Sequence, residues 1–262
     1  MISIITPVLN GERFIESCIK NVIHQNCPSA QHIIIDGGST DSTVSIIQAY
    51  AGRYPHLRWI SEKDRGQSDA MNKGVALAQG GILGFLNVDD YYEIGALQRM
   101  SDLFRTLPEP SLLVGNCNVW GDDEVLLGVN KPSRLRMADL LIGDEARYPF
   151  PVNPSAYFYH KTLHEKIGLY DTEEQYAMDI DFLLRAIPHV HVVHLDEVLG
   201  NYRLIRGTKT FADMEAGRMD ARLQQLILRH KKELPYYQRV RILFMGNLYR
   251  SWRSIQKLSR KA

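Results

Sequence analysis

Short apolar runs alternate with helix-like segments along the first hundred residues. Between the first two runs, and again between the second and third, apolar residues recur at the i, i+4 spacing of a helix. A strand–helix–strand repeat of roughly 25 to 30 residues is typical of a parallel sheet covered by helices on both faces. We therefore expect an α/β fold with a mostly parallel, twisted sheet. The expected strands are Ser3–Thr6, His32–Asp36, Leu57–Ser61 and Ile82–Asn87.

The alternation loosens after residue 110, although strand-like runs continue. A length of 262 residues suits one large domain or a domain with an appendage. We expect a main domain over residues 1–210, made of a Rossmann-like half (1–110) and a second half (111–210), and a helical C-terminal extension over 211–262. The later expected strands are Leu112–Val119, Ser155–Tyr159 and Val190–Leu195, with a helix beginning near Asp179.

Composition places the chain among soluble globular proteins, with 45% hydrophobic and 23% charged residues. Three cysteines without metal-ligand spacing favour a reducing compartment and no zinc site. The sequence shows neither a signal-peptide pattern nor an apolar run long enough to span a membrane. These features predict a cytoplasmic location. The charge is uneven, because residues 229–262 hold ten Lys or Arg and one acid, Glu233.

The fourth expected strand runs into two adjacent carboxylates, Asp89 and Asp90, in the stretch GFLNVDDYY. One interpretation is a pair of solvated loop acids. The alternative is a site for Mg²⁺ or Mn²⁺, which take one or two protein carboxylates and complete their shell with water and substrate phosphates. The chain has neither a GxxxxGK nor a GxGxxG motif. A phosphorylated substrate at this sheet edge would therefore depend on the cation.

Four segments in order and spacing resemble the family-2 inverting glycosyltransferases of the GT-A fold. They are ISIITPVLNGERFIESCIKNVIHQ, IIIDGGSTDST, SEKDRGQSDAMNKGVALAQG and GFLNVDDYY. The resemblance is dense over residues 1–100 and resumes over 150–205. It is greatest to bacterial enzymes that build surface polysaccharide or lipopolysaccharide repeat units. It implies transfer of one hexosyl or N-acetylhexosaminyl group, with 1–110 as the nucleotide-sugar half and 111–210 as the acceptor half.

The resemblance also implies a donor site at the strand ends. Asp89 and Asp90 would form the acidic metal motif for Mn²⁺ or Mg²⁺, with Asp89 facing the ribose or donor sugar and Asp90 on the cation that bridges the diphosphate. The donor would be a nucleoside-diphosphate sugar, with UDP favoured. Other implied donor residues are Thr6, Pro7 and Val8 at the base, Asp36 at the base or ribose, and Asp64, Gly66 and Asn72 on the nucleotide side.

A catalytic base is implied by YAMDIDFLLR, residues 176–185, which resembles the family segment that carries it. The register puts Asp179 at the catalytic position. Asp181 is two residues further on and points about 200° away on a helix, so we expect it to be a helix-terminal charge or a pocket-wall residue. The alternative for both is that they are acids that complement a helix dipole.

Several positions depart from the family pattern. Val8 stands where many relatives have an aromatic side chain, and Asn153-Pro154 stands where many have His-Gln. The QxxRW motif of processive synthases is absent, and no histidine stands just after NYRLIRG to complete a metal shell. Arg203 or Arg206 would then contact the leaving diphosphate, and Arg65 could pair with a phosphate. For Asn72, a polar helix face is the alternative.

The expected acceptor is a glycan or a polyprenyl-diphosphate-linked glycan. A sugar-1-phosphate nucleotidyltransferase and a non-catalytic nucleotide-sugar or glycan-binding module are the alternative functions. The basic tail predicts peripheral binding to an anionic membrane at the cytoplasmic face of the inner membrane, with packing on the domain as the alternative, and no nucleic acid partner. Its expected apolar face is Phe244, Leu248, Trp252 and Ile255, flanked by Arg241, Arg250, Arg253 and Lys257.

Overall fold

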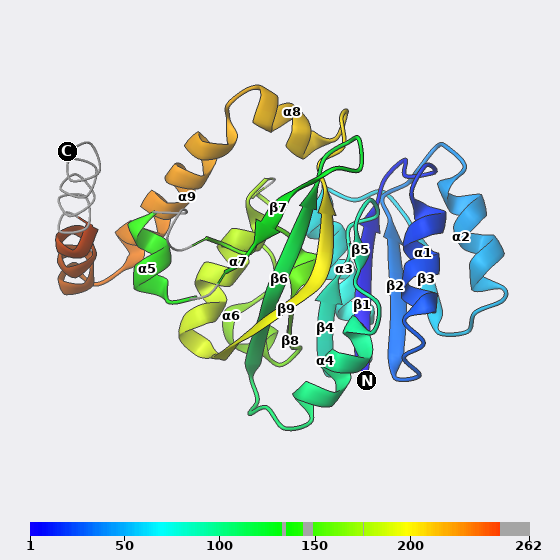
Figure 1. Ribbon diagram of the computed structural model, residues 1–262, viewed down its shortest axis with the longest axis horizontal. Helices are drawn as coiled ribbons and strands as arrows, with labels where there is room; N and C mark the ends of the chain where they lie inside the picture. The colour runs from blue at the N-terminus through cyan, green and yellow to red at the C-terminus, as the bar shows by residue number, and fades with distance from the viewer. Residues whose placement is uncertain (133–134, 144–148, 175, 247–262) are drawn as a thin grey trace.

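The chain builds one continuous sheet of nine strands in the part that the computed structural model describes, residues 1–132, 135–143, 149–174 and 176–246 (Figure 1). The strands are β1 (Ile2–Val8), β2 (Ala30–Asp36), β3 (Leu57–Ser61), β4 (Ile82–Phe85), β5 (Tyr91–Tyr92), β6 (Ser111–Trp120), β7 (Leu126–Asn130), β8 (Tyr157–His160) and β9 (His191–Arg203). Their order is β3-β2-β1-β4-β8-β6-β9-β5, and β7 pairs with β6.

The sheet is mixed but mostly parallel. The pairings give six strands one direction (β1, β2, β3, β4, β6 and β9), and β5, β7 and β8 run against them. The predicted α/β class is therefore confirmed. The sheet continues across residue 110 through β8, which pairs with both β4 and β6. The division into halves at that residue stays a prediction.

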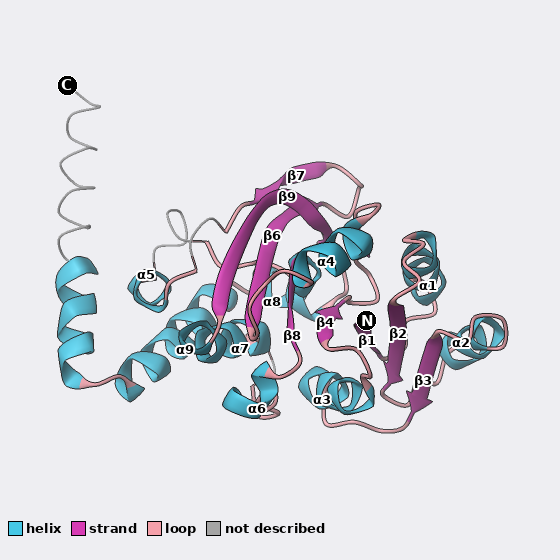
Figure 2. Cartoon of the chain, turned by 90° about the horizontal axis from the view of Figure 1, so that it is seen from below, coloured by secondary structure: helices cyan, strands magenta, loops and turns pink. Residues whose placement is uncertain are grey.

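Helices cover both faces of the sheet (Figure 2). They are α1 (Ile15–His24), α2 (Thr43–Ala51), α3 (Gln67–Leu77), α4 (Ala96–Phe104), α5 (Met137–Ile142), α6 (Leu163–Ile167), α7 (Met178–Ala186), α8 (Lys209–Glu215) and α9 (Met219–Glu233), with the short 3-10 helices η1 (Pro154–Ala156) and η2 (Ile187–His189). Side chains alternate along β1, so Ile5 packs into the core with α3 and α7, while Ile4 packs with α1 and α4.

A close approach of α3 to the sheet depends on Gly74. A Cβ atom at this position would lie 2.3 Å from Cγ2 of Ile5, which is nearer than two carbon atoms can approach. Replacing this glycine would push α3 away from β1. The helix connects the end of β3 to the start of β4. Its position against the sheet therefore determines where the loop after β4 lies.

Among the strand ends that differ from the sequence prediction, those of β4 and β9 bear on the acidic pair. β4 ends at Phe85, two residues before the expected Asn87, because Asn87 to Asp90 form a turn closed by a bond from the Asp90 N–H to the Asn87 carbonyl at 3.0 Å. β9 extends to Arg203 instead of Leu195, because it pairs with β6 through two register shifts. The longer β9 brings Arg203 beside the acidic pair.

The C-terminal extension packs on the main domain as far as the structure describes it. Leu226, Ile227 and Ile242 are buried in the same core as α7. Residues 236–246 are helical. The predicted tail residues Leu248, Arg250, Trp252, Arg253, Ile255 and Lys257 lie outside the described residues. Among the described helices, none combines the length and apolar character needed to cross a membrane.

Candidate active site

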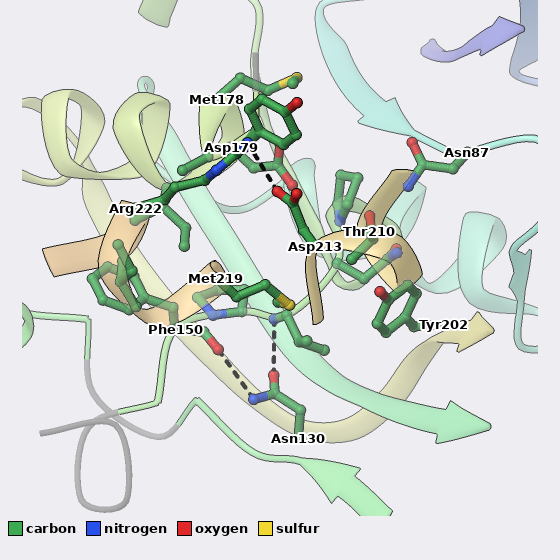
Figure 3. A pocket seen from close by; sticks show the side chains of 18 of the residues that line it. Asn87, Asn130, Phe150, Met178, Asp179, Tyr202, Thr210, Asp213, Met219 and Arg222 are labelled. Carbon is green, nitrogen blue, oxygen red and sulfur yellow. Dashed lines mark hydrogen bonds and ion pairs between the residues drawn. The ribbon is translucent and has the colours of Figure 1, made fainter. Parts of the chain in front are cut away.

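A cavity of about 450 Å³ opens where the loop after β4 and the end of β9 meet the first turn of α7 (Figure 3). Its position beyond the carboxyl end of β4 is where α/β sheets commonly bind ligands. Its lining includes Asn87 from the β4 loop, Asn153 before η1, Asp179 of α7, Tyr202 of β9, and Asp213 and Arg222 from α8 and α9. The cavity therefore joins the sheet to the C-terminal helices.

Asp90 is the buried member of the acidic pair and is only 1% exposed. Its Oδ1 accepts a hydrogen bond from the backbone N–H of Arg203 at 3.0 Å. Its Oδ2 accepts from the amides of Asn87 at 3.1 Å and Asn153 at 2.7 Å. Burial and the neighbouring charge of Asp89 raise the pKa of Asp90 to about 8, and these three donors oppose that rise. Asp90 thus connects three separate segments of the chain.

Asp89 has a different environment. Its side chain is partly exposed, and among the described residues no side chain and no other residue's N–H donates a hydrogen bond to its carboxylate. Arg203 instead donates from Nε to the backbone carbonyl of Asp89. Burial raises the pKa of Asp89, and the Arg203 charge partly offsets this rise. Of the two carboxylates, Asp89 is the one whose oxygens remain available to a ligand.

The acidic pair fits a divalent cation only in part. The pKa values of both adjacent carboxyls are raised, and a bound cation would stabilise their ionised forms. Within the described ranges, no group of three His, Cys, Asp or Glu side chains converges to form a complete metal shell. Any cation here would need most of its ligands from water or substrate, as Mg²⁺ sites commonly do.

Asp179 lies in the cavity, as its predicted catalytic role requires. Burial raises the pKa of its carboxyl to about 6. Tyr202 also lines the cavity, and burial together with the charges of Asp90, Asp89 and Asp179 raises the pKa of its hydroxyl. Asp179 itself lines the cavity, whereas the acidic pair is connected to it through Asn87 and Asn153, the cavity residues that donate to Asp90.

Asp181 faces the other way and binds the C-terminal extension. It is 2% exposed, and Oδ2 accepts from Nε of Arg185 at 2.9 Å. Oδ1 contacts Arg229 Nη2 at 2.6 Å and His230 Nε2 at 2.9 Å, both from α9. Burial alone would raise the pKa of Asp181, but bonds from His230, Arg185 and Arg229 lower it to about 2. Asp181 thus anchors α9 to the helix that carries Asp179.

We expect Asp181→Asn to lower the free energy of unfolding at pH 7 by about 3 kcal/mol, because it removes the buried carboxylate that pairs with Arg185 and Arg229 and bonds His230. The depressed pKa means that this stabilisation is fully present above pH about 4 and is lost as pH falls toward 2. Urea unfolding at several pH values measures the difference between the two proteins. Asp102→Asn is the control, because its pair with Arg105 is solvent-exposed and such pairs contribute under about 1 kcal/mol. An equal loss in both variants would contradict the anchor.

The predicted base-binding residues are buried at the end of β1. Thr6 is fully buried, and its hydroxyl lies 2.9 Å from His32 Nε2. Pro7 and Val8 are also buried. Asp36 accepts bonds from the N–H groups of Gly38 and Ser39 and from Ser61. None of these residues lines the cavity, so their roles toward a base stay predictions.

The nucleotide-side residues are only partly brought together. Asp64 accepts from the Gly66 N–H at 2.9 Å, and a Cβ on Gly37 would lie 2.5 Å from Asp64 Oδ2, so Asp64 sits against the end of β2. Asn72 is oriented elsewhere, because both ends of its amide bond the backbone of Tyr170 at 2.9 Å.

The three predicted phosphate-binding arginines are also separate from the cavity. Arg65 is exposed and contacts Asp69 at 3.4 Å, and Arg206 is exposed in the loop after β9. Arg203 is held at the acidic pair by its bonds to Asp89 and Asp90. Neither Arg65 nor Arg203 nor Arg206 lines the cavity. Their contacts with a phosphate stay predictions.

Several residues of the cavity were not predicted from the sequence. Asp213 is 4% exposed and pairs with Arg222 at 2.8 Å and with Arg218 at 2.9 Å. Figure 3 shows the Asp213–Arg222 pair beside Asp179. Tyr202 lies in the quoted segment NYRLIRG, but only its place in the cavity lining distinguishes it. No sequence signal could have placed α8 and α9 at the site, since their residues are remote in sequence from the β4 loop.

The model of the family described as Glycosyl transferase family 2 matches residues 3–162. The chain belongs to glycosyl transferase family 2. As a family-2 glycosyltransferase it transfers a sugar from a nucleotide-sugar donor. The predicted family and enzyme class are confirmed.

Relatives of this family-2 glycosyltransferase include a Mycobacterium tuberculosis protein described as a PGL/p-HBAD biosynthesis glycosyltransferase, 31% identical over 220 residues and 82% of each chain. The Bacillus subtilis glycosyltransferase EpsJ is 29% identical, over 78% of this chain and 61% of its own. The solved structure of S. aureus TarS 1-349 with UDP-GlcNAc matches 92% of this chain and 70% of that one, with a TM-score of 0.70 at 17% identity. The mannosyltransferase PcManGT from Pyrobaculum calidifontis, solved with GDP-Man and Mn²⁺, has a TM-score of 0.58 at 14% identity, over 98% of this chain and 84% of that one. Both confirm the GT-A-type fold.

Proposed function

We propose that this enzyme transfers one sugar, with inversion, from a nucleoside-diphosphate sugar to a hydroxyl of a glycan or lipid-linked glycan in bacterial surface polysaccharide synthesis. The observation that carries the proposal is that Asp179, with its raised pKa, shares one cavity with the loop that bears the acidic pair. A UDP-sugar is the first donor to test, because S. aureus TarS, which has a similar fold, was solved with UDP-GlcNAc.

Asp179 supplies the base for this reaction. Its carboxylate takes the proton of the acceptor hydroxyl as the oxygen attacks the anomeric carbon. The bond from that carbon to the diphosphate oxygen breaks on the opposite face, and the nucleoside diphosphate leaves with the bonding pair. One carboxylate on the acceptor side is sufficient for this single displacement, which inverts the configuration.

Mn²⁺ or Mg²⁺ would be held by Asp89 together with the donor diphosphate, and when bound would offset the charge of the leaving group. Asp89 suits this role better than Asp90, because three N–H donors already occupy the Asp90 oxygens. This assignment differs from the sequence prediction, which placed Asp90 on the cation.

A panel of donors tests the proposed function. The purified enzyme is incubated with UDP-, GDP- and dTDP-sugars and either Mn²⁺ or Mg²⁺, and release of the nucleoside diphosphate is measured with and without chelator. We expect slow hydrolysis of at least one donor, lost in excess chelator. Full turnover in chelator would contradict the cation requirement, and no binding or hydrolysis of any donor would contradict the donor class.

We also propose that the enzyme works at an anionic membrane on the cytoplasmic face. In the helical stretch 236–246, five large apolar side chains are exposed: Tyr236, Tyr237, Val240, Leu243 and Phe244. At helical spacing, Arg239 and Arg241 fall on either side of this apolar face, which gives the amphipathic pattern of an interfacial helix. Ile242 is buried on the opposite side, so the stretch packs on the domain and still presents an apolar face.

We expect the double variant Leu243→Ser/Phe244→Ser to float less with phosphatidylglycerol liposomes than the unaltered enzyme at low salt. The two side chains are 56% and 63% exposed, so their removal costs membrane contact rather than core packing. Met214→Ser is the control, because Met214 is 42% exposed on α8, outside this stretch. Equal flotation of all three proteins, or none by any of them, would show that the apolar face does not bind membrane.

A further inference from the structure

Three exposed apolar side chains gather at the active-site cavity. Val152, Tyr176 and Met219 are 40%, 46% and 42% exposed and come from the loop before η1, the segment before α7 and the start of α9. All three line the cavity that contains Asp179. Exposed apolar groups from separate elements around one cavity are typical of a ligand-binding surface. We call Val152, Tyr176 and Met219 the apolar wall.

Two members of the apolar wall, Tyr176 and Met219, lie on elements held by charged groups. The guanidinium carbon of Arg222 lies 3.0 Å from the centroid of the Tyr176 ring, and Arg222 Nη1 lies 2.8 Å from Asp213 Oδ2. Asp213 is buried. Met219 begins α9, the helix that Asp181 anchors to α7. Tyr176 and Met219 are therefore positioned before a ligand binds, which reduces the entropy lost on binding.

The cavity has polar groups as well, and those nearest the acidic pair come from the loop after β4, the start of α3 and the loop before η1. Gln67 donates to Asn87 Oδ1 at 2.9 Å, and both side chains line the cavity with Asn153. This part of the lining adjoins Asp90, which bonds Asn87 and Asn153. A donor sugar with its diphosphate near the acidic pair would use these polar groups. A hydroxyl acceptor must reach Asp179, so the rest of the acceptor meets the apolar wall.

We propose that the acceptor carries an apolar group, alkyl or aryl, next to the portion that holds the reacting hydroxyl, and that the apolar wall recognises this group. A wall for an unmodified sugar would need polar partners for its hydroxyls. Val152 and Met219 offer none. The inference rests on the proposed function for the orientation of the acceptor toward Asp179, but the binding it predicts can be measured without turnover.

Matched glycosides test the inference. Binding of methyl, octyl and phenyl glycosides of glucose, galactose, mannose and N-acetylglucosamine is measured by calorimetry or ligand-observed NMR. We expect the octyl or the phenyl glycoside of at least one sugar to bind about tenfold more tightly than its methyl counterpart. The two arms distinguish an alkyl from an aryl group. Met219→Ser should remove most of this preference, and Met214→Ser, at the same 42% exposure outside the cavity, should keep it.

The result that overturns the inference is equal binding of methyl and apolar glycosides, or an equal loss of preference in both methionine variants. Donor hydrolysis without acceptor, measured in the same preparations, reports separately on the proposed function. Donor hydrolysis without a preference for apolar glycosides would support the proposed function and contradict the inference. A preference for apolar glycosides without hydrolysis of any donor would support recognition by the apolar wall and contradict the proposed function.

Discussion

Replacing Asp179 with asparagine is expected to slow sugar transfer by about 10²–10⁴-fold while leaving nucleotide-sugar affinity unchanged. The carboxylate acts on the acceptor hydroxyl, and asparagine is similar in shape but cannot take the proton. Initial rates of transfer and calorimetric binding of the donor measure the two effects. Asp181→Asn is the comparison, because Asp181 faces α9 instead of the cavity. A larger loss of transfer in Asp181→Asn, measured where both variants are folded, would mean that Asp181 is the base.

The pH dependence of transfer provides an independent check on Asp179. Burial raises the pKa of its carboxyl to about 6, and only the ionised form can accept a proton. The rate should therefore fall as pH is lowered through about 6 and should level off above it. This acidic limb should be absent in the residual activity of Asp179→Asn. An unchanged limb in that variant would assign it to another group.

Replacing Asp89 with alanine is expected to abolish cation-dependent donor binding and leave the fold intact. The main expected effect of Asp90→Ala is instead a loss of protein stability. Alanine at 90 leaves the N–H donors of Arg203, Asn87 and Asn153 without their acceptor. Each unsatisfied buried donor costs about 1–3 kcal/mol. Asp89 accepts no such bonds from other described residues.

Urea unfolding and calorimetric titration of Mn²⁺ with a nucleoside diphosphate separate these outcomes. The Asp89→Ala protein should unfold like the unaltered enzyme and should fail to bind the cation with the nucleotide. An Asp90→Ala protein of unaltered stability that has lost cation binding would instead support the role that the sequence pattern assigned to Asp90.

Local patterns in the sequence were sufficient for the first four strands and the family. The alternation of apolar runs predicted β1 to β4, because a strand buried on both faces and a helix buried on one each leave their own periodicity in the chain. The same pattern placed Asp89 and Asp90 just after β4. It could not show that β4 ends at Phe85, because the turn that follows depends on a backbone bond between Asp90 and Asn87.

Tertiary structure decided what each polar side chain does. Asp89 and Asp90 are adjacent in sequence, yet the partners of Asp90 include Asn153 and Arg203, which are 63 and 113 residues away. Asp181 resembles a second active-site acid until α9 brings Arg229 and His230 against it. Periodicity reports which face of an element is buried, and that is a local property. The role of a carboxylate depends on the donors and charges that packing brings to it, and in this protein those come from distant parts of the chain.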